Sequence, residues 1–209
     1  MREVHWEEIS TAVSELCKRI NYFLNQDVFD AFKEGMRAEE SPLGKKVRCQ
    51  LIKNAEAAAE ERIPLCQDTG IAVVFISVGQ EVVIKGKNLT DAVNIGVAKG
   101  YSEGYLRKSV VKDPVNRVNT GDNTPAIIHT EIVPGDKIKI TVSAKGGGSE
   151  NMSALSMLPP SAGCEGIIDF VVDTVKKAGP NPCPPLFIGV GVGGNFELAP
   201  LLAKKALLR

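Results

Sequence analysis

The sequence is poor in aromatic residues, has no excess of either charge and contains no long apolar run. Aromatic residues make up 5% of its 209 positions and apolar residues 44%, which predicts a globular core built mainly from aliphatic side chains. Lysine plus arginine equals aspartate plus glutamate, at 25 each. Because balanced charge gives no overall field for nucleic acid or an anionic membrane, we expect a small-molecule partner held by local cations.

The chain also lacks the roughly 20 consecutive apolar residues that a membrane-spanning helix requires. No apolar run or cleavage signal stands near Met1. Its five cysteines, at positions 17, 49, 66, 164 and 183, form an odd set without paired spacings. These absences predict a protein of the reducing cytoplasm that does not insert into a membrane.

The apolar pattern predicts the mixed α/β class, with N-terminal helices followed by hairpins and a mixed sheet with packed helices. Apolar residues recur at three- and four-residue steps from Val4 to Leu24, which predicts a first helix with Cys17 in its buried stripe. Asp27 is expected to cap a second helix that runs to about Glu40. Further helices are expected over 45–62, 90–106 and 164–177 and from about 196.

Strands are expected where the apolar period changes to two or where short apolar runs are bounded by turn residues. Segments 71–78 and 81–85 are predicted to form a hairpin around Gly79-Gln80, and segments 126–133 and 137–145 a second hairpin around Pro134-Gly135-Asp136. A further strand is expected over 186–192. We expect residues 1–209 to form a single domain, truncated at its C-terminus because the helix over 201–208 has no glycine cap or turn.

Two cysteines occupy tight loops beside predicted strands, in Cys66-Gln67-Asp68-Thr69-Gly70 and in Asn181-Pro182-Cys183-Pro184-Pro185. A packing cysteine normally lies on the apolar face of a helix or strand, as expected for Cys17, whereas a loop cysteine has a fixed backbone and an exposed sulfur. Two unreactive thiols are the alternative. The loops therefore make Cys66 and Cys183 candidates for binding a metal.

Four segments occur in one order along the chain: the two cysteine loops, Asn119-Thr120-Gly121-Asp122-Asn123-Thr124-Pro125-Ala126 and Lys145-Gly146-Gly147-Gly148-Ser149-Glu150-Asn151-Met152. Together they resemble the iron-sulfur hydro-lyases, the family of class I fumarate hydratase and L-tartrate dehydratase. The resemblance covers nearly the whole chain. It is closest to the N-terminal part of the separate α subunit of two-subunit members.

The resemblance implies a 4Fe-4S cluster held by three cysteines, with one iron open to substrate. Cys66 and Cys183 match two of these ligands, and the third is expected beyond residue 209. Cys164 is left out of the ligand set, because it begins a predicted amphipathic helix and Cys183 matches the family's second ligand instead.

The resemblance also implies a site for a small dicarboxylate. Gln67, Asp68, Arg107 and Gly148 match substrate-binding residues, and Asp68 is the candidate catalytic group for moving a proton or holding a hydroxyl. A guanidinium gives a planar two-point hold on a carboxylate. Three of them also have an ordinary structural alternative: Arg107 as a solvated arginine, Asp68 as an aspartate that caps a turn, and Gly148 as part of a tight glycine turn.

Two further features are interpreted as having no direct part in catalysis. Gly189-Val190-Gly191-Val192-Gly193-Gly194 satisfies a dinucleotide fingerprint, but only about fifteen residues follow it, too few for the rest of that unit. These glycines are expected to allow close backbone approach beside the cysteine loop. His129 is expected on the surface or facing a partner.

The predicted function is that of a hydro-lyase subunit that reversibly adds water to fumarate, giving malate. The alternatives are an L-tartrate dehydratase subunit and a non-catalytic metal or redox-binding module. The resemblance implies a β-subunit or C-terminal-domain type of partner chain in a hetero- or homo-oligomer, without nucleic acid or membrane. Because two ligands are too few, the chain alone is expected to hold no stable cluster and to be inactive.

Overall fold

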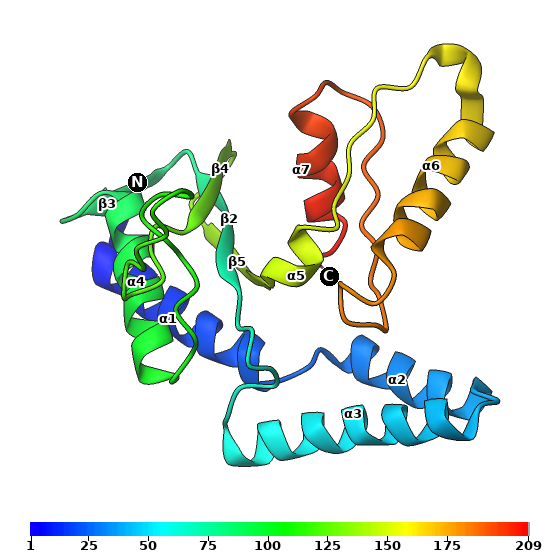
Figure 1. Cartoon of the computed structure of the whole chain (residues 1–209). Helices are drawn as coiled ribbons and strands as arrows, with labels where there is room; N and C mark the ends of the chain where they lie inside the picture. The colour runs from blue at the N-terminus through cyan, green and yellow to red at the C-terminus, as the bar shows by residue number, and fades with distance from the viewer. Residues whose placement is uncertain (209) are drawn as a thin grey trace. The chain divides into compact units, whose positions relative to one another are not determined.

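The computed structural model describes residues 1–208, and the chain divides into two compact units (Figure 1). The first unit is Met1–Lys145 and the second unit is Gly146–Arg209. Helices and strands both occur, which confirms the predicted mixed α/β class. The single domain over the whole chain stays a prediction. No helix within residues 1–208 has the length and apolar content needed to cross a bilayer.

The first unit begins with a short strand, β1 (Arg2–His5), followed by helix α1 (Trp6–Tyr22). The predicted start of this helix at Val4 was wrong, because Val4 pairs in parallel with Ile84 of β3 (Val82–Lys85). The Glu8 side chain accepts a hydrogen bond from the His5 amide at 3.0 Å. This cap satisfies a backbone donor and fixes the helix start after His5.

Helices α2 (Gln26–Ala38) and α3 (Pro42–Glu61) follow as a helical hairpin (Figure 1). The cap of α2 is Asn25 and not Asp27, so that prediction was wrong by two residues. Ser41 caps α3 by accepting a hydrogen bond from the Gly44 amide. Proline at the first helical position needs no hydrogen-bond partner there, so α3 begins at Pro42, earlier than predicted.

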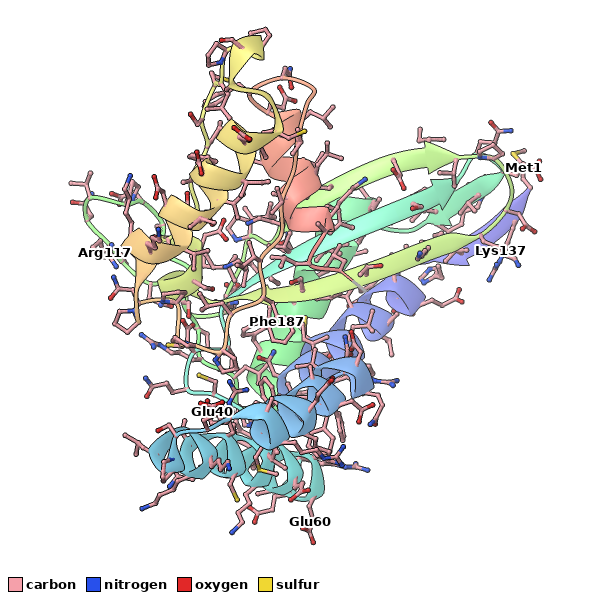
Figure 2. The ribbon with its side chains drawn as sticks, turned by 90° about the vertical axis from the view of Figure 1, so that its right-hand side faces the viewer. Met1, Glu40, Glu60, Arg117, Lys137 and Phe187 are labelled. Carbon is pink, nitrogen blue, oxygen red and sulfur yellow. The ribbon has the colours of Figure 1, made fainter. Side chains whose placement is uncertain are left out.

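The main sheet of the first unit has the strand order β4-β2-β5. The central strand β2 (Ile71–Gly79) pairs in parallel with β4 (Ile127–Val133) and antiparallel with β5 (Ile138–Lys145). Both predicted hairpins were therefore wrong, because β3 pairs with β1, and β2 lies between β4 and β5 (Figure 2). The mostly apolar sequence of β2 suits a central strand with neighbours on both sides.

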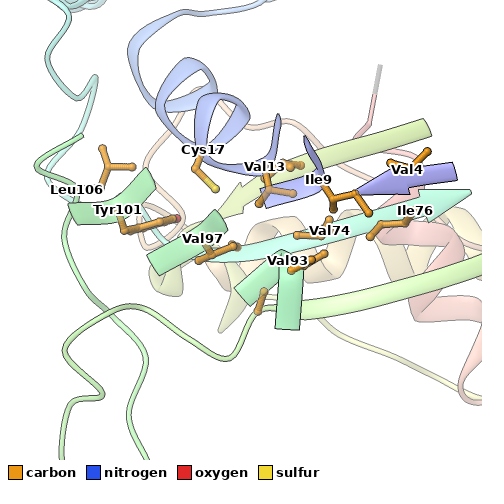
Figure 3. Packing of buried hydrophobic residues seen from close by; sticks show 14 of the residues in the cluster. Val4, Ile9, Val13, Cys17, Val74, Ile76, Val93, Val97, Tyr101 and Leu106 are labelled. Atoms are coloured by element: carbon orange, nitrogen blue, oxygen red, sulfur yellow. The ribbon is translucent and has the colours of Figure 1, made fainter. Parts of the chain in front are cut away.

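Helices α1 and α4 (Leu89–Glu103) form the core together with one face of β2 (Figure 3). Gly96 and Gly100 of α4 allow this packing, because an added Cβ would meet the backbone oxygens of Ser10 and Ser14 at 2.5 and 2.7 Å. Cys17 lies in this interface and is 0% exposed, as predicted. Burial raises the pKa of its thiol to about 12, so it stays protonated.

The second unit contains α5 (Gly147–Glu150), a 3-10 turn (Pro160–Ala162), α6 (Gly163–Ala178) and α7 (Leu198–Lys205). The helix predicted over 164–177 is confirmed by α6. The strand predicted over 186–192 was wrong, since this segment pairs with no strand in the described chain. Gly189 and Gly191 instead lie against α7, where an added Cβ would overlap the carbonyl oxygens of Ala203 and Ala199.

Candidate functional site

The first cysteine loop lies between α3 and β2 and exposes its sulfur. Cys66 and Gln67 are exposed, and Asp68 is half-buried. The Asp68 amide donates a hydrogen bond to Cys66 Sγ at 3.4 Å, and one Asp68 carboxylate oxygen accepts from the Gly70 amide at 3.1 Å. One oxygen of Asp68 therefore caps the turn. This is the structural alternative that the sequence suggested for Asp68. The loop presents a thiol whose sulfur already accepts one amide hydrogen.

Arg107 follows α4, and its side chain is exposed. The backbone of Arg107 is tied to the cysteine loop, because Thr69 Oγ1 donates to its carbonyl oxygen at 3.1 Å. Thr69 itself is only 3% exposed. This bond brings together two motifs that are 38 residues apart in the sequence. A candidate metal ligand and a candidate carboxylate anchor therefore lie on adjoining loops of the first unit.

Two buried polar residues behind these loops were not singled out from the sequence. Tyr101 and Asn123 are both 0% exposed. Tyr101 Oη donates to the Thr69 carbonyl oxygen at 2.8 Å, and Asn123 Nδ2 donates to the Gly70 carbonyl oxygen at 3.1 Å. Burial raises the pKa of the Tyr101 phenol, so it stays protonated and can donate. Asn123 lies in the motif 119–126, which was the one feature of the sequence that could have pointed to it.

The other two motifs adjoin each other within the second unit. Gly148 of α5 is exposed, and a Cβ added there would stand 3.2 Å from the carbonyl oxygen of Asn181. Asn181 belongs to the second cysteine loop, and its Nδ2 lies 3.6 Å from Met152 Sδ. The glycine turn and the loop of Cys183 are therefore neighbours.

Cys183 is exposed and has a left-handed backbone, with φ 60°. A residue with a Cβ adopts this conformation at a cost of about 1–3 kcal/mol, and such residues concentrate at functional sites. Cys66 and Cys183 belong to different units, so their role as ligands of one cluster stays a prediction. Cys164 is exposed in the first turn of α6, and Cys49 is half-buried on α3.

The structure also places His129 and the glycines over 189–194, the two features that were interpreted as having no direct part in catalysis. His129 is half-buried on β4, where its ring stacks on Phe75 with 4.8 Å between ring centroids. The glycines over 189–194 follow no strand, and α7 begins only at Leu198. They lack the strand–turn–helix setting of a dinucleotide site, as expected. Their close approach is to α7 and not, as expected, to the cysteine loop.

The two loop cysteines suit an iron-sulfur cluster in their chemistry but do not complete its ligand set. Thiolates are the usual protein ligands of such clusters, and hydrogen bonds to sulfur tune them. Both cysteines are free thiols with exposed sulfurs, and the sulfur of Cys66 accepts an amide hydrogen bond. Among residues 1–208 no three His, Cys, Asp or Glu side chains are grouped as a metal site. A cluster with one open iron needs a third thiolate in addition to these two.

Comparison with known proteins identifies the family. The family described as fumarate hydratase (fumerase) matches residues 10–209. A protein of Methanocaldococcus jannaschii named "Putative L(+)-tartrate dehydratase subunit alpha" is 41% identical over 211 residues, which cover 97% of this chain and 73% of the relative. The L(+)-tartrate dehydratase subunit alpha of Escherichia coli is 31% identical over 205 residues, or 97% of this chain and 67% of the relative.

The family match extends over nearly the whole chain, through both units and all four motifs. The chain belongs to the fumarate hydratase (fumerase) family. The resemblance inferred from the motifs and the prediction of a hydro-lyase subunit are therefore confirmed. The site residues stay predictions, because membership of a family does not test individual side chains.

Proposed function

We propose that this chain is the α-type subunit of a hydro-lyase that reversibly adds water to fumarate, forming malate. One observation carries the proposal: the exposed thiol loop of Cys66 and the exposed guanidinium segment of Arg107 are joined by the Thr69 hydrogen bond. A redox module needs the thiol but has no use for a carboxylate anchor beside it. A dicarboxylate hydro-lyase needs both.

Arg107 holds one substrate carboxylate by two parallel hydrogen bonds, which fix both position and orientation. Gln67 is exposed next to Cys66 and binds a polar group of the same substrate. Gly148, whose backbone is exposed and has no side chain to obstruct it, offers close approach to the substrate. These contacts bind the substrate in one orientation before any bond is broken.

Asp68 is the candidate for the proton step or for holding the hydroxyl group. One of its oxygens is held by the Gly70 amide, so the carboxylate has a fixed orientation beside Cys66. A fixed carboxylate loses little freedom when it accepts or delivers a proton, which is what general acid–base catalysis requires.

Cys66 and Cys183 are the residues of this chain that would hold an iron-sulfur cluster. The cluster would supply a Lewis-acidic iron for the carboxylate and hydroxyl of the substrate. The third thiolate comes from outside residues 1–209, and further cations come from a partner chain of the β-subunit type. The names of the relatives, which are α subunits, support such a partner. A cytoplasmic location suits the reduced thiols.

L-tartrate is the second candidate substrate, because the relatives compared above carry tartrate dehydratase names. Tartrate and malate both present two carboxylates, and they differ by one hydroxyl group that a few side chains could discriminate. The candidate substrates can be compared by assaying the complete enzyme for turnover of fumarate, malate and L-tartrate under anaerobic conditions. The substrate with the highest kcat/KM is the one for which the site is built.

Replacement of Arg107 tests the proposal. In the assembled enzyme, Arg107→Ala should reduce kcat/KM by roughly ten- to hundredfold, since a charged hydrogen-bonded contact contributes about 1.5–3 kcal/mol. Arg107→Lys should also fail, because an ammonium group cannot form the two-point contact. Arg117 is the matched control, since it is exposed on the loop that follows Arg107 (Figure 2). Unchanged kinetics in Arg107→Ala would make this residue an ordinary surface arginine.

A reconstitution experiment tests the ligand set independently of turnover. The chain alone is incubated anaerobically with iron and sulfide, and bound iron and sulfide are counted. We expect less than one four-iron cluster per chain and no hydration of fumarate or tartrate. A stoichiometric cluster in the chain alone would contradict the assignment, and Cys164→Ser would then test Cys164 as the third ligand.

A further inference from the structure

The cysteine loop and the arginine segment are held from behind by buried side chains that no catalytic assignment uses. Thr69, Tyr101 and Asn123 are 3%, 0% and 0% exposed. Each of them bonds to the backbone of the cysteine loop or of the arginine segment, and none presents its polar atoms to solvent. Such buried polar groups are costly unless every hydrogen bond is made, so their geometry fixes the backbone around them.

The Gly70 carbonyl oxygen is the point where these bonds meet. It accepts from Asn123 Nδ2 at 3.1 Å and lies 3.3 Å from Tyr101 Oη, which also donates to the Thr69 carbonyl oxygen at 2.8 Å. The end of the cysteine loop is therefore held from helix α4 through Tyr101 and from the segment 119–126 through Asn123.

Asn123 also holds the segment that follows Arg107. Its Oδ1 accepts hydrogen bonds from the Ser109 amide at 2.6 Å and the Val110 amide at 3.2 Å. The two ends of one side-chain amide thus bind two different backbone segments. Asn123 has a left-handed backbone with φ 64°, which asparagine tolerates better than most residues. Asparagine is suited to this position by both its backbone and its side chain.

We propose that Tyr101 and Asn123 are positioning residues that set the distance between the Cys66 loop and the Arg107 segment, with Thr69 as the direct connection. This inference rests on the proposed function for its catalytic consequence. A site that binds the substrate at two points needs those points held at a fixed separation, and misplacement by about 1 Å can cost on the order of a hundredfold in rate.

The Tyr101→Phe variant tests the role of the buried hydroxyl group. It keeps the packed ring and removes the hydroxyl group, which bonds to Thr69 and Gly70 and also interacts with the Asn21 side chain. Tyr22→Phe is the matched control, because Tyr22 is also buried and its hydroxyl group donates to the Gly104 carbonyl oxygen at 3.0 Å and not to the cysteine loop. Each variant loses buried hydrogen bonds from a tyrosine hydroxyl group to backbone carbonyl oxygens, so both melting temperatures should fall.

The variants should differ at the cysteine loop. In the full chain, amide hydrogen exchange over residues 66–70 should become about tenfold faster in Tyr101→Phe and stay unchanged in Tyr22→Phe. In the assembled enzyme, Tyr101→Phe should also raise KM and lower kcat for the dicarboxylate, while Tyr22→Phe stays within about twofold of wild type. Equal exchange over 66–70 in the two variants would overturn the proposal.

Asn123→Asp separates the two ends of the side-chain amide. The variant keeps an oxygen for the amides of Ser109 and Val110 but loses the donor to Gly70. We expect faster exchange over residues 66–70 with little change over 109–110, whereas Asn123→Gly should loosen both segments without adding backbone strain. Unchanged exchange over residues 66–70 in Asn123→Asp would contradict the proposal.

These measurements distinguish this inference from the proposed function. Faster exchange at the cysteine loop with normal kinetics in Arg107→Ala would leave the positioning role intact and remove the catalytic assignment. If exchange over residues 66–70 stayed at the wild-type rate in both Tyr101→Phe and Asn123→Asp while Arg107→Ala had impaired kinetics, the positioning role would be wrong. The catalytic assignment of Arg107 would stand.

Discussion

The two units differ in how they bury their side chains. The first unit holds a continuous apolar core from α1, α4 and the sheet. Within the described part of the second unit, Ala178 is the one buried residue. Large apolar side chains there are exposed instead, among them Ile168, Phe187, Ile188, Val190, Val192, Phe196 and Leu198.

The proposed site residues of the two units therefore differ in how well the surrounding structure supports them. Apolar burial is the main favourable contribution to folding and must offset the loss of chain entropy. The Cys66 loop and Arg107 are attached to a closed core, so their geometry is fixed by the first unit. The Gly148 turn and the Cys183 loop are attached to elements with little burial of their own. We expect the first pair to be rigid and the second pair to be adjustable.

Hydrogen exchange over the full chain should show the largest contrast. Amides of β2 are in the centre of a sheet and should exchange only through global unfolding, whereas amides of α6 should exchange through local opening. A difference of about 4 kcal/mol in opening free energy corresponds to roughly a thousandfold in rate. Comparable protection in β2 and α6 would mean that the second unit is as stable as the first.

Matched isoleucine truncations should give the next largest difference. Ile76 in β2 is 1% exposed and Ile188 in the second unit is 54% exposed. Ile76→Ala should lower the free energy of unfolding by about 2–5 kcal/mol, because it removes buried atoms and leaves a cavity. Ile188→Ala should change it by less than about 1 kcal/mol. Denaturant unfolding followed by circular dichroism measures both, and similar losses would contradict the contrast.

Alkaline pH should destabilise the first unit through Cys17. Burial raises the pKa of its thiol from 9.0 to about 12. Between these values the unfolded chain releases a proton that the folded chain keeps, so stability falls as pH rises from about 9 towards 12. The total loss is on the order of 4 kcal/mol. Cys17→Ala should flatten this pH dependence, and an unchanged slope would remove Cys17 as its cause.

Glycine-to-alanine substitutions should give a smaller difference. A Cβ at Gly96 would stand 2.5 Å from the Ser10 carbonyl oxygen, while a Cβ at Gly147 would meet nothing within 4 Å. Gly96→Ala should therefore destabilise the chain by about 1–3 kcal/mol, as overpacking does. Gly147→Ala should be neutral or slightly stabilising, since alanine favours a helix. Thermal melting curves compare the two, and equal shifts would mean that α1 and α4 separate at little cost.

Local patterns were predictable from the sequence, and pairings between distant segments were not. The apolar stripe that includes Cys17 recurs at three- and four-residue steps within one short segment, so helix α1 and its buried face could be inferred from the sequence. The hairpins were wrong because strand order depends on partners far along the chain. Gly79-Gln80 and Pro134-Gly135-Asp136 are turn sequences, but a turn does not require the strands on either side of it to pair with each other.

The residues of the candidate site also divide into those that local sequence patterns predicted and those that only the tertiary structure shows. Cys66, Cys183 and Gly148 could be proposed because each lies in a recognisable motif, and Arg107 because the family resemblance implies a substrate-binding arginine there. Tyr101 and Asn123 were missed because only tertiary structure shows that they are buried. Asn123 stands in a run of polar loop residues, where the sequence alone favours an exposed turn. Its importance becomes visible only when its hydrogen bonds to two backbone segments are traced.

The central position of β2 also sets the order in which the chain can fold during synthesis. Both partners of β2 come later in the sequence, since its pairing with β4 begins at Ile127 and its pairing with β5 ends at Lys145. Until the ribosome has released those residues, β2 has two open edges and an apolar surface. Such exposed strands slow folding and invite aggregation. Premature release before residue 145 should therefore yield an insoluble fragment, although the helices that precede β2 are already complete.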